Sequence, residues 1–347
     1  MGDTEFYDGT KLLSMVDLDG NKPEILMCTS NRNGGKTTFF GRYVVNRWKR
    51  GKGKFILVYR WDYELDEVAD TFYKEIGNLF FPNTIMSSKR HKKGLYHELF
   101  INEKSCGYAV ALNKADALKK VSHLFVDATI MLFDEFQSET NHYCPEEIKK
   151  FQSIHTSFAR GGGKQVRFLP IIMLSNPVSI INPYYVKLGI SSRLTFDTKF
   201  LRGHGFILEQ GFNESASKAQ QETGFARAFE GDDYMNYASQ AVYLNDNQAF
   251  IEKPTGAYGK YVATLKYKDK CFSVREYQSL GIIYCDDKYD RDYPFKISIT
   301  TDDHNVNYVM LKNNDFFIQT MRFYFDHGAF RFKDLQCKEA IMTAISY

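Results

Sequence analysis

The sequence lacks the marks of a membrane, secreted or zinc-binding protein. Its longest apolar run, near Phe168–Leu174, is far shorter than the ~20 residues that a membrane span needs. Met1–Thr10 contains Asp3 and Glu5 and does not have the basic-then-apolar order of a secretory signal peptide. The cysteines form no C-x-x-C pair, which argues against a metal site and favours reduced thiols in a cytosolic protein. They are Cys28, Cys106, Cys144, Cys271, Cys285 and Cys337.

Neither sign of charge is in large excess, and no internal repeat or low-complexity tract occurs. The 45 Lys and Arg residues stand against 42 Asp and Glu residues, so the formal net charge is +3. Because so small a net charge attracts no polyanion by itself, any nucleic acid must be bound through local basic patches. The 347 residues, with 29 Phe and 23 Tyr among them, are enough for two well-packed domains.

Short apolar segments alternate with amphipathic ones through the first half of the chain. The apolar segments predict strands at Glu24–Cys28, Lys54–Tyr59, Ala128–Phe133, Phe168–Leu174 and Arg193–Phe196. The amphipathic segments predict helices at Phe39–Trp48, Glu64–Ile76, Lys114–Val121 and Pro145–Ala159. Strands that are apolar on both faces and separated by helices are typical of a parallel sheet with helices on both faces. We therefore expect an α/β fold for this part of the chain.

The character of the sequence changes near Leu208. Asn213–Gln240 is polar and predicts a helical linker, whereas Tyr261–Tyr267 and Cys271–Tyr277 alternate as the two strands of a hairpin do. We expect a first domain over residues 1–207, a linker over residues 208–245 and a C-terminal α+β domain over residues 246–347.

A glycine-bearing loop follows the first predicted strand and leads into a helix, as a Walker A phosphate loop does. Its backbone amides around Gly34 and Gly35 can converge on phosphate oxygens, because no Cβ intrudes there. Lys36 is expected to reach the β- and γ-phosphates, and the Thr37 hydroxyl to bind Mg²⁺. The predicted nucleotide-binding residues are Ser30, Asn31, Arg32, Asn33, Gly34, Gly35, Lys36, Thr37 and Thr38.

The loop departs from the full pattern at its first position, where Ser30 stands in place of glycine. Taken alone, it could be an ordinary turn between a strand and a helix. The second motif, Ile130–Glu135, has four apolar residues followed by two acids, as in a Walker B strand. The carboxyl ends of parallel strands meet at one edge of the sheet, where ligands bind in open α/β folds. The two motifs together therefore predict a P-loop ATPase.

The acidic pair has separate expected roles. Asp134 is expected to help to hold Mg²⁺ through its water shell. Glu135 is expected to accept a hydrogen bond from the attacking water, which polarises that water. A third residue, Asn176, lies in the segment Leu174–Pro177, just after the predicted strand Phe168–Leu174. Its side-chain amide can donate and accept hydrogen bonds, and it is expected to sense the γ-phosphate. An Asn-Pro turn without such a role is the alternative for Asn176.

Taken together, these segments resemble the DNA-packaging ATPases of phi29-like bacteriophages, relatives of large terminases and of FtsK/HerA translocases. The resemblance spans about Phe6 to Ile180 and includes Arg32 inside the phosphate loop, a feature typical of packaging ATPases. Its other segments are Lys54–Trp61 followed by Glu64-Leu65, Phe133–Phe136 and Met173–Asn176. The fold implied is the additional-strand, RecA/FtsK-like P-loop NTPase.

The resemblance also implies a function and its partners. The chain would use ATP and Mg²⁺ to drive double-stranded DNA into a procapsid. It would act as a homo-oligomeric ring, expected to be a pentamer, on the capsid portal (connector). Packaging RNA is a further candidate partner, and no membrane is involved. The expected location is the host cytoplasm, with transient docking on the procapsid.

Basic residues supply two further sets of candidates. Arg160, which precedes three glycines, is the candidate arginine finger that completes a neighbouring subunit's site, and Arg167 and Arg193 are its rivals. DNA contacts should be directed at phosphates, because a packaging motor must accept any sequence. The basic run Ser87–Gly94 is expected to be a loop. The candidate DNA-binding residues are Lys89, Arg90, Lys92 and Lys93 in that run, and Lys119 and Lys120 before the Walker B strand.

The C-terminal domain is expected to be a vestigial RNase H-like fold without cutting activity. The predicted strand Tyr261–Tyr267 carries no acid, and Asp286, Asp287, Asp290 and Asp292 cluster in what the sequence predicts to be a loop. Three alternatives stay open: a translocase of the FtsK/HerA kind, a terminase with an active nuclease, and a nucleotide switch that is not a motor.

Overall fold

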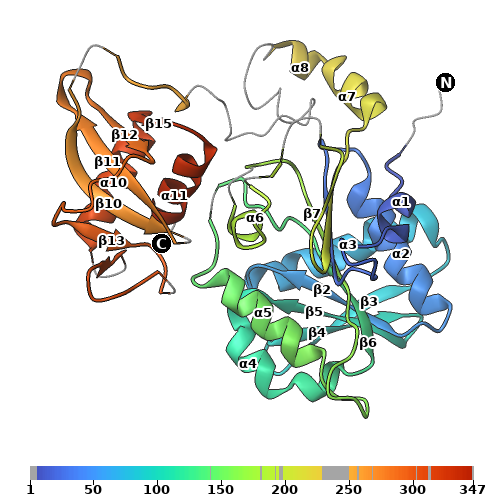
Figure 1. Cartoon of the computed structure of the whole chain (residues 1–347). Coiled ribbons are helices and arrows are strands. Elements are labelled where there is room, and N and C mark those ends of the chain that lie inside the picture. The colour runs from blue at the N-terminus through green and yellow to red at the C-terminus, as the bar shows by residue number, and fades with distance from the viewer. Residues whose placement is uncertain are drawn as a thin grey trace. The chain divides into compact units, whose positions relative to one another are not determined.

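The computed structural model describes residues 6–140, 142–179, 182–191, 193–194, 198–228, 250–255, 258–267, 269–301, 303–311 and 314–345. Two compact units make up the chain (Figure 1). The first combines Met1–Ser179 with Thr195–Leu244, and the second combines Ile180–Leu194 with Asn245–Tyr347. Within these described ranges, we find no helix with the length and hydrophobicity of a membrane span.

The first unit is built on a nine-stranded sheet in the order β3-β4-β5-β2-β6-β7-β1-β9-β8. Neighbouring strands from β5 to β9 in that order are parallel, and β3, β4 and β8 join antiparallel. This confirms the predicted parallel sheet. The strands are β1 Ile25–Thr29, β2 Lys54–Tyr59, β3 Met86–His91, β4 Tyr96–Ile101, β5 Lys104–Ala111, β6 Ala128–Phe133, β7 Ile171–Ser175, β8 Phe200–Arg202 and β9 Phe206–Gln210.

Helices cover both faces of this sheet, as predicted. Phe55 and Leu57 of β2 pack in the same core as Phe40 of α2 and Leu65 of α3. The side chains between them face the other way, and on that other face Phe133 of β6 stacks on Phe151 of α5, with ring centroids 6.5 Å apart. The helices are α1 Thr10–Ser14, α2 Lys36–Lys49, α3 Tyr63–Phe80, α4 Ala115–Lys120, α5 Glu147–Phe158, α7 Glu214–Gln221 and α8 Gly224–Ala228, with 3-10 turns η1 Leu112–Lys114 and η2 Ser122–Phe125.

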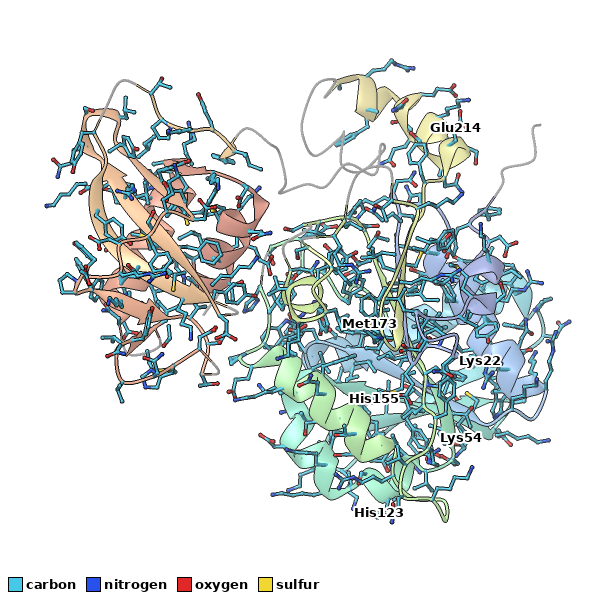
Figure 2. The ribbon with its side chains drawn as sticks, viewed as in Figure 1. Lys22, Lys54, His123, His155, Met173 and Glu214 are labelled. Atoms are coloured by element: carbon cyan, nitrogen blue, oxygen red, sulfur yellow. The ribbon has the colours of Figure 1, made fainter. Side chains whose placement is uncertain are left out.

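The strand direction defines two edges of the sheet. Lys54 begins β2 and His123 precedes β6, so both mark the edge at the amino ends of the parallel strands, at the bottom of Figure 2. Glu214 follows β9 and marks the opposite edge, at the top. Met173 of β7 is buried between these edges.

The structure corrects several predicted elements of the first unit. Ser87–Gly94 is not only a loop, because β3 runs through its first residues to His91. The strand predicted at Phe168–Leu174 begins later, at Ile171, since Pro170 has no N–H to donate to the ladder. Of the strand predicted at Arg193–Phe196, residues 195–196 lie outside the described residues, and residues 193–194 are not in a strand.

The expected end of the first domain, at residue 207, differs from the structure, whereas the chain divides between Leu244 and Asn245, next to the expected start of the C-terminal domain. β9 pairs with β1 along Phe206–Gln210, so the sheet continues past residue 207, which the sequence takes as the end of the first domain. The segment Ile180–Leu194 groups with the second unit, where Val186 belongs to the hydrophobic core. Of the predicted helical linker, α7 and α8 are helical, and residues 229–249 lie outside the described residues.

The second unit is an α+β structure, as predicted. Its six-stranded sheet has the order β14-β13-β10-β11-β12-β15, in which β10, β11 and β12 form an antiparallel meander and β13 is parallel to β10. The strands are β10 Lys260–Tyr267, β11 Lys270–Tyr277, β12 Ile282–Asp286, β13 Lys296–Ser298, β14 Val309–Met310 and β15 Phe330–Phe332. The helical elements are α6 Pro183–Lys187, α10 Asp315–Asp326, α11 Leu335–Ile345 and the turn η4 Gln278–Leu280.

Candidate nucleotide-binding site

The predicted phosphate loop connects β1 to α2 at the carboxyl edge of the sheet. Ser30 and Asn31 are buried, and Asn33 and Gly35 take left-handed conformations with φ of 58° and 91°. Gly35 is required here, because a side chain at that φ is strained and its Cβ would lie 3.3 Å from the Phe6 ring. The helix α2 begins at Lys36, so its first amide groups point into the loop and favour an anion there.

Lys36 is buried at the mouth of the loop. Its ammonium donates to Asn176 Oδ1 at 2.7 Å and to the Ser30 carbonyl at 3.3 Å. Burial lowers the pKa of Lys36, and the nearby Asp134 charge opposes this effect. The Lys36–Asn176 contact joins residues 140 positions apart and brings the phosphate loop against the end of β7. These two predicted site residues therefore belong to one site.

The acidic pair lies at the same edge. β6 ends at Phe133, which is opposite Met173 of the neighbouring β7. Asp134 shares a hydrogen bond with the Thr37 side chain, and its Oδ1 accepts from the Glu135 amide at 3.0 Å. Two oxygen groups at the start of α2 and the end of β6 thus lie together, as a Mg²⁺ site requires.

Both acids hold their protons more tightly than ordinary carboxyl groups do. Desolvation raises the pKa of Asp134, although Lys36 and the Thr37 hydrogen bond oppose this rise. Desolvation also raises the pKa of Glu135, with further contributions from the charges of Asp134 and Glu139. Glu135 nevertheless exposes its side chain to solvent, so a water molecule can reach it.

The backbone of Glu135 is held in an uncommon conformation. Its φ of 56° is left-handed, which costs a non-glycine residue on the order of 1 kcal/mol or more. The next residue, Phe136, donates its amide to the Leu174 carbonyl at 3.0 Å. A strained turn of this kind persists only where surrounding contacts hold it.

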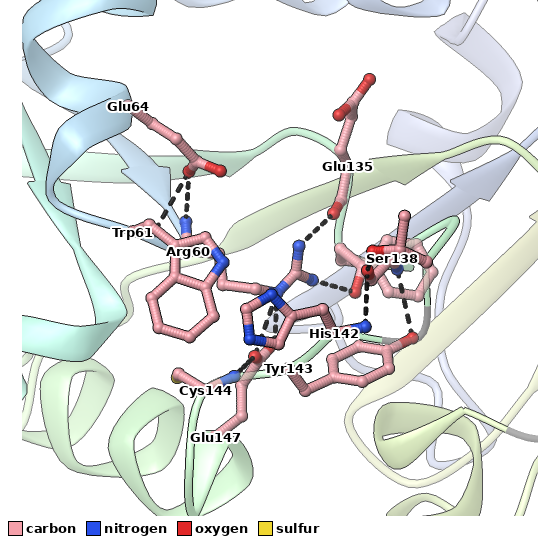
Figure 3. Close-up of polar contacts among 11 residues, drawn as sticks. Arg60, Trp61, Glu64, Glu135, Ser138, His142, Tyr143, Cys144 and Glu147 are labelled. Atoms are coloured by element: carbon pink, nitrogen blue, oxygen red, sulfur yellow. Dashed lines mark hydrogen bonds and ion pairs between the residues drawn. The ribbon is translucent and has the colours of Figure 1, made fainter.

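Arg60, at the end of β2, makes several of those contacts (Figure 3). Its guanidinium donates to the Glu135 carbonyl at 3.2 Å and to the Phe136 carbonyl at 2.7 Å, and its Nε donates to Glu147 at 3.0 Å. The rings of Phe133 and Tyr143 lie 5.7 and 5.0 Å from the guanidinium carbon. Arg60 thus ties both ends of the loop between β6 and α5 to the sheet.

The same loop is also tied internally, and the turn that carries Arg60 is closed by a contact of its own. Glu147 accepts from the Cys144 amide at 2.9 Å, and Tyr143 accepts from the Ser138 amide at 3.2 Å. Glu64 accepts from the amides of Arg60 and Trp61 at 2.9 and 3.1 Å, which closes the turn after β2 (Figure 3). The sequence predicts no role for Arg60, because nothing near it in the chain reveals its partners.

Glu139 is a second residue without a predicted role. It forms an ion pair with Arg32, and its Oε1 lies 3.4 Å from Asn176 Nδ2. The side chain of Arg32 thus extends from the phosphate loop and contacts the loop after β6. Asn176 in turn accepts from Lys36, so these contacts connect Arg32 with Lys36 through Glu139 and Asn176.

The candidate arginine fingers lie in different surroundings. Arg160 is exposed just after α5. Arg167 donates its guanidinium to the carbonyls of Ala128 and Phe158, which joins the end of α5 to the start of β6. That turn is at the amino edge of the sheet, opposite the phosphate loop, so Arg160 lies away from the phosphate loop of its own chain. Arg193 belongs to the second unit, where its amide donates to the Ile190 carbonyl.

The candidate DNA-binding residues form two separate groups. Lys89 and Arg90 lie on β3, an edge strand, and Lys92 and Lys93 form the turn to β4. Tyr96, which begins β4, pairs with Val110 at the carboxyl end of β5, so this turn lies at the edge that carries the phosphate loop. Lys119 and Lys120 end α4, on the path back from β5 to the amino end of β6.

Comparisons with known proteins agree with this arrangement. The DNA packaging protein of Bacillus phage phi29 is 25% identical over 331 residues, which cover 94% of this chain and 93% of that protein. A chain of the Phi-28 gp11 DNA packaging motor aligns over 99% of both chains, with a TM-score of 0.64 and 16% identity. A chain of the bacteriophage Phi-29 viral genome packaging motor assembly aligns over 98% of this chain and 99% of that one, with a TM-score of 0.58 and 24% identity.

The family assignment rests on nearly the whole chain and on the site described above. The model of the podovirus DNA encapsidation protein (Gp16) matches residues 1–345, a span that includes both units. It therefore covers the phosphate loop, the acidic pair that ends β6, and Asn176. The chain belongs to the podovirus DNA encapsidation protein (Gp16) family.

Proposed function

We propose that this DNA-packaging protein is a motor that hydrolyses ATP to move double-stranded DNA into a procapsid. The observation that carries the proposal is the meeting of Lys36 with Asp134 and Glu135 at one edge of the sheet. A phosphate-binding ammonium beside an acidic pair is what phosphoryl transfer to water requires. ATP would bind through Ser30–Thr38, with its phosphates against the amides of the loop.

Each residue would have a defined task in hydrolysis. Mg²⁺ would be held by the Thr37 hydroxyl and, through water, by Asp134, and would neutralise charge on the phosphates. Lys36 would contact the β- and γ-phosphates in place of its present partner Asn176, whose amide would then sense the γ-phosphate. Glu135 would orient and polarise the attacking water.

The partners follow from the family. Relatives form packaging motor assemblies, and we propose for this chain a homo-oligomeric ring, expected to be a pentamer, on the capsid portal. Packaging RNA stays a candidate partner. The site of action would be the host cytoplasm, at the procapsid.

For the C-terminal unit we propose a role in contact with DNA, portal or packaging RNA, and not in DNA cutting. A meander followed by a strand parallel to its first member is compatible with an RNase H-like topology. Its first strand, β10, carries no acid. Asp286 accepts from the Ser273 hydroxyl at 2.5 Å, and Asp287 pairs with Lys333, so both carboxylates have partners within the unit.

Removal of charge from the β3–β4 turn tests DNA binding. We expect the triple variant Lys89→Gln, Lys92→Gln, Lys93→Gln to weaken duplex binding at all sequences. The slope of log affinity against log salt should flatten by up to ~0.9 for each DNA phosphate that the variant no longer neutralises. Arg90 is left intact, because it pairs with Asp66 at 3.6 Å. The measurement is duplex binding at several salt concentrations, together with ATP hydrolysis with and without duplex.

The double variant Lys119→Gln, Lys120→Gln tests the second basic group in parallel. Hydrolysis without DNA should stay at the wild-type rate in both variants, which shows that they fold. An unchanged salt slope in the triple variant would show that Lys89, Lys92 and Lys93 do not bind DNA. A wild-type protein whose hydrolysis ignores duplex DNA would favour the nucleotide switch over the motor.

A mixing experiment tests the arginine finger. Arg160→Ala is expected to lower hydrolysis by about 10³-fold or more, because a finger neutralises transition-state charge. Rings that mix Arg160→Ala with Glu135→Gln subunits should recover part of the rate, since some interfaces then carry an intact pair. Lys164→Ala, in the same exposed turn, is the matched control. Intact assembly with no recovery at any mixing ratio would exclude a role in trans.

A further inference from the structure

The residues that follow β9 run beside the phosphate loop. β9 pairs with β1 as far as Gln210 and Thr29, and the Gly211 amide then donates to the Thr29 carbonyl at 2.7 Å. Two residues further on, Asn213 is half-buried and contacts the loop that follows β1. The hydrolysis proposed above gives Asn213 no task.

Asn213 and Asn31 hold each other through reciprocal hydrogen bonds. The Asn31 side-chain amide donates to the Asn213 carbonyl at 3.0 Å, and the Asn213 backbone amide donates to Asn31 Oδ1 at 2.9 Å. Asn31 is fully buried, so its polar side-chain atoms need partners within the protein. Because the donor and the acceptor of Asn31 both contact the backbone of Asn213, this pair fixes the register between the phosphate loop and the chain after β9.

The side chain of Asn213 also connects the loop to helix α7. Its Oδ1 accepts from the Ala216 amide at 2.9 Å, which makes Asn213 the N-cap of α7. Its Nδ2 donates to the Gly34 carbonyl at 3.2 Å. The two atoms belong to one planar amide group, so a rotation that breaks one of these hydrogen bonds also disturbs the other. The start of α7 and the phosphate loop are thus held by the same side chain.

The Gly34 carbonyl sets the direction of one amide of the phosphate loop. This carbonyl and the Gly35 N–H belong to one planar peptide unit, and in a trans peptide they point in opposite directions. Asn213 and the Tyr7 backbone amide both donate to the carbonyl, at 3.2 and 2.8 Å, and hold it on one side of the loop. The Gly35 amide is thereby directed to the opposite side.

We propose that Asn213 is a positioning residue that directs the Gly35 amide at the bound phosphates and makes the start of α7 respond to nucleotide. The proposal rests on the proposed function, since it takes the phosphates to lie in Ser30–Thr38. A phosphate that accepts from Gly35 fixes this peptide unit, and with it the carbonyl to which Asn213 donates. Hydrogen bonds linked through one peptide group polarise each other, so the contact with Asn213 is strengthened.

The coupling acts in both directions. If nucleotide at the loop stabilises the start of α7, the nucleotide must bind more weakly by the same factor when the link is removed. α7 is the first helix after β9 along the chain, before the second unit resumes at Asn245. The link therefore gives nucleotide binding an effect outside the phosphate site, on the segment that leads to the second unit.

Asn213→Ser tests the link, because serine can still cap α7 but is too short to reach the Gly34 carbonyl. In the full-length protein with Mg²⁺, we would measure the affinity for the slowly hydrolysed analogue ATPγS by calorimetry, and the hydrogen exchange of the α7 amides with and without it. ATPγS should slow this exchange in the wild type. The variant should bind ATPγS about 2- to 12-fold more weakly, the range for one net hydrogen bond. The slowing of α7 exchange by ATPγS should shrink by a similar factor.

Two further variants complete the experiment. Asn31→Ala removes the reciprocal hydrogen bonds from the side of the loop, and it should change both measurements in the same direction as Asn213→Ser. Asn314→Ser is the matched control, because Asn314 caps α10 of the second unit and accepts from the Phe317 amide at 3.1 Å. It should leave both measurements at their wild-type values.

A role for Asn213 as a helix cap alone predicts different results. Asn213→Ser would then leave the affinity for ATPγS unchanged, or would change α7 exchange equally with and without ATPγS. Either result would overturn the proposal, as would a wild-type protein that binds ATPγS without any slowing of α7 exchange. These results would leave the phosphate site as proposed, whereas a wild-type protein that does not bind ATPγS would overturn the proposed function itself.

Discussion

Glu135→Gln is expected to lower the rate of ATP hydrolysis by about 10²- to 10⁴-fold, the contribution of a positioned general base. Glutamine keeps the size of the side chain and can still accept a hydrogen bond, but it cannot take a proton from the attacking water. ATP should still bind, because Lys36 and the loop amides hold the phosphates independently of Glu135. The measurement is steady-state hydrolysis together with ATP affinity, with and without duplex DNA.

The pH dependence of the wild type gives a second readout of the same residue. Glu135 must be ionised to act as a base, and its pKa is raised by desolvation and by the charge of Asp134. As the pH falls, Glu135 therefore takes up its proton earlier than an ordinary glutamate, and hydrolysis should decline from a correspondingly higher pH. The Gln variant should lack this limb of the profile. Glu103→Gln, at an exposed turn, is the matched control and should behave as the wild type does.

Arg60→Lys is expected to lower the rate of hydrolysis by about 10²-fold, the usual effect of a misplacement of ~1 Å in a catalytic geometry. A lysine keeps the charge beside Glu147, but a single ammonium cannot span Glu147 and the carbonyls of Glu135 and Phe136 as the guanidinium does. The left-handed turn at Glu135 would then lose hydrogen bonds that hold it in place. ATP affinity should change little, because these hydrogen bonds of Arg60 hold the loop after β6 and not the phosphate loop.

A double variant separates this positioning role from simple stabilisation. Arg60→Met leaves the carboxylate of Glu147 buried without its partner, which should destabilise the fold by about 3–5 kcal/mol. Adding Glu147→Gln removes the uncompensated charge and should restore much of the free energy of unfolding. The rate of hydrolysis should stay low in the double variant, because the two carbonyls are still not held. Full recovery of the rate with recovery of stability would assign Arg60 to stability alone.

The local patterns of the sequence were enough to predict which segments meet at the carboxyl edge of the sheet. The loop Ser30–Thr37 and the acids after Ala128–Phe133 each lie within a few residues of a buried strand. The chemistry of each motif is contained in its own short segment, and the direction of parallel strands brings the segments to one edge. The strands Lys54–Tyr59 and Ala128–Phe133 were predicted with their observed bounds, since a fully buried strand is apolar along its whole length.

The edge strand β3 was not predicted, because it is not buried and therefore has no apolar run. β3 has the sequence MSSKRH, and most of its side chains are exposed or half-buried. An edge strand of this kind carries no run of apolar residues, and its charged side chains discourage pairing with other chains. Only its ladder with β4 identifies it as a strand.

By itself, then, the sequence determined the phosphate loop, the acidic pair, Asn176 and the parallel sheet that carries them. Only the tertiary structure decided which distant residues meet them: Arg60 meets the backbone of Glu135 and the carboxylate of Glu147. It also decided that Arg32 pairs with Glu139. The physical reason is that periodicity reports how deeply a segment is buried, whereas a contact between side chains far apart in the chain depends on the register and order of the strands that bring them together.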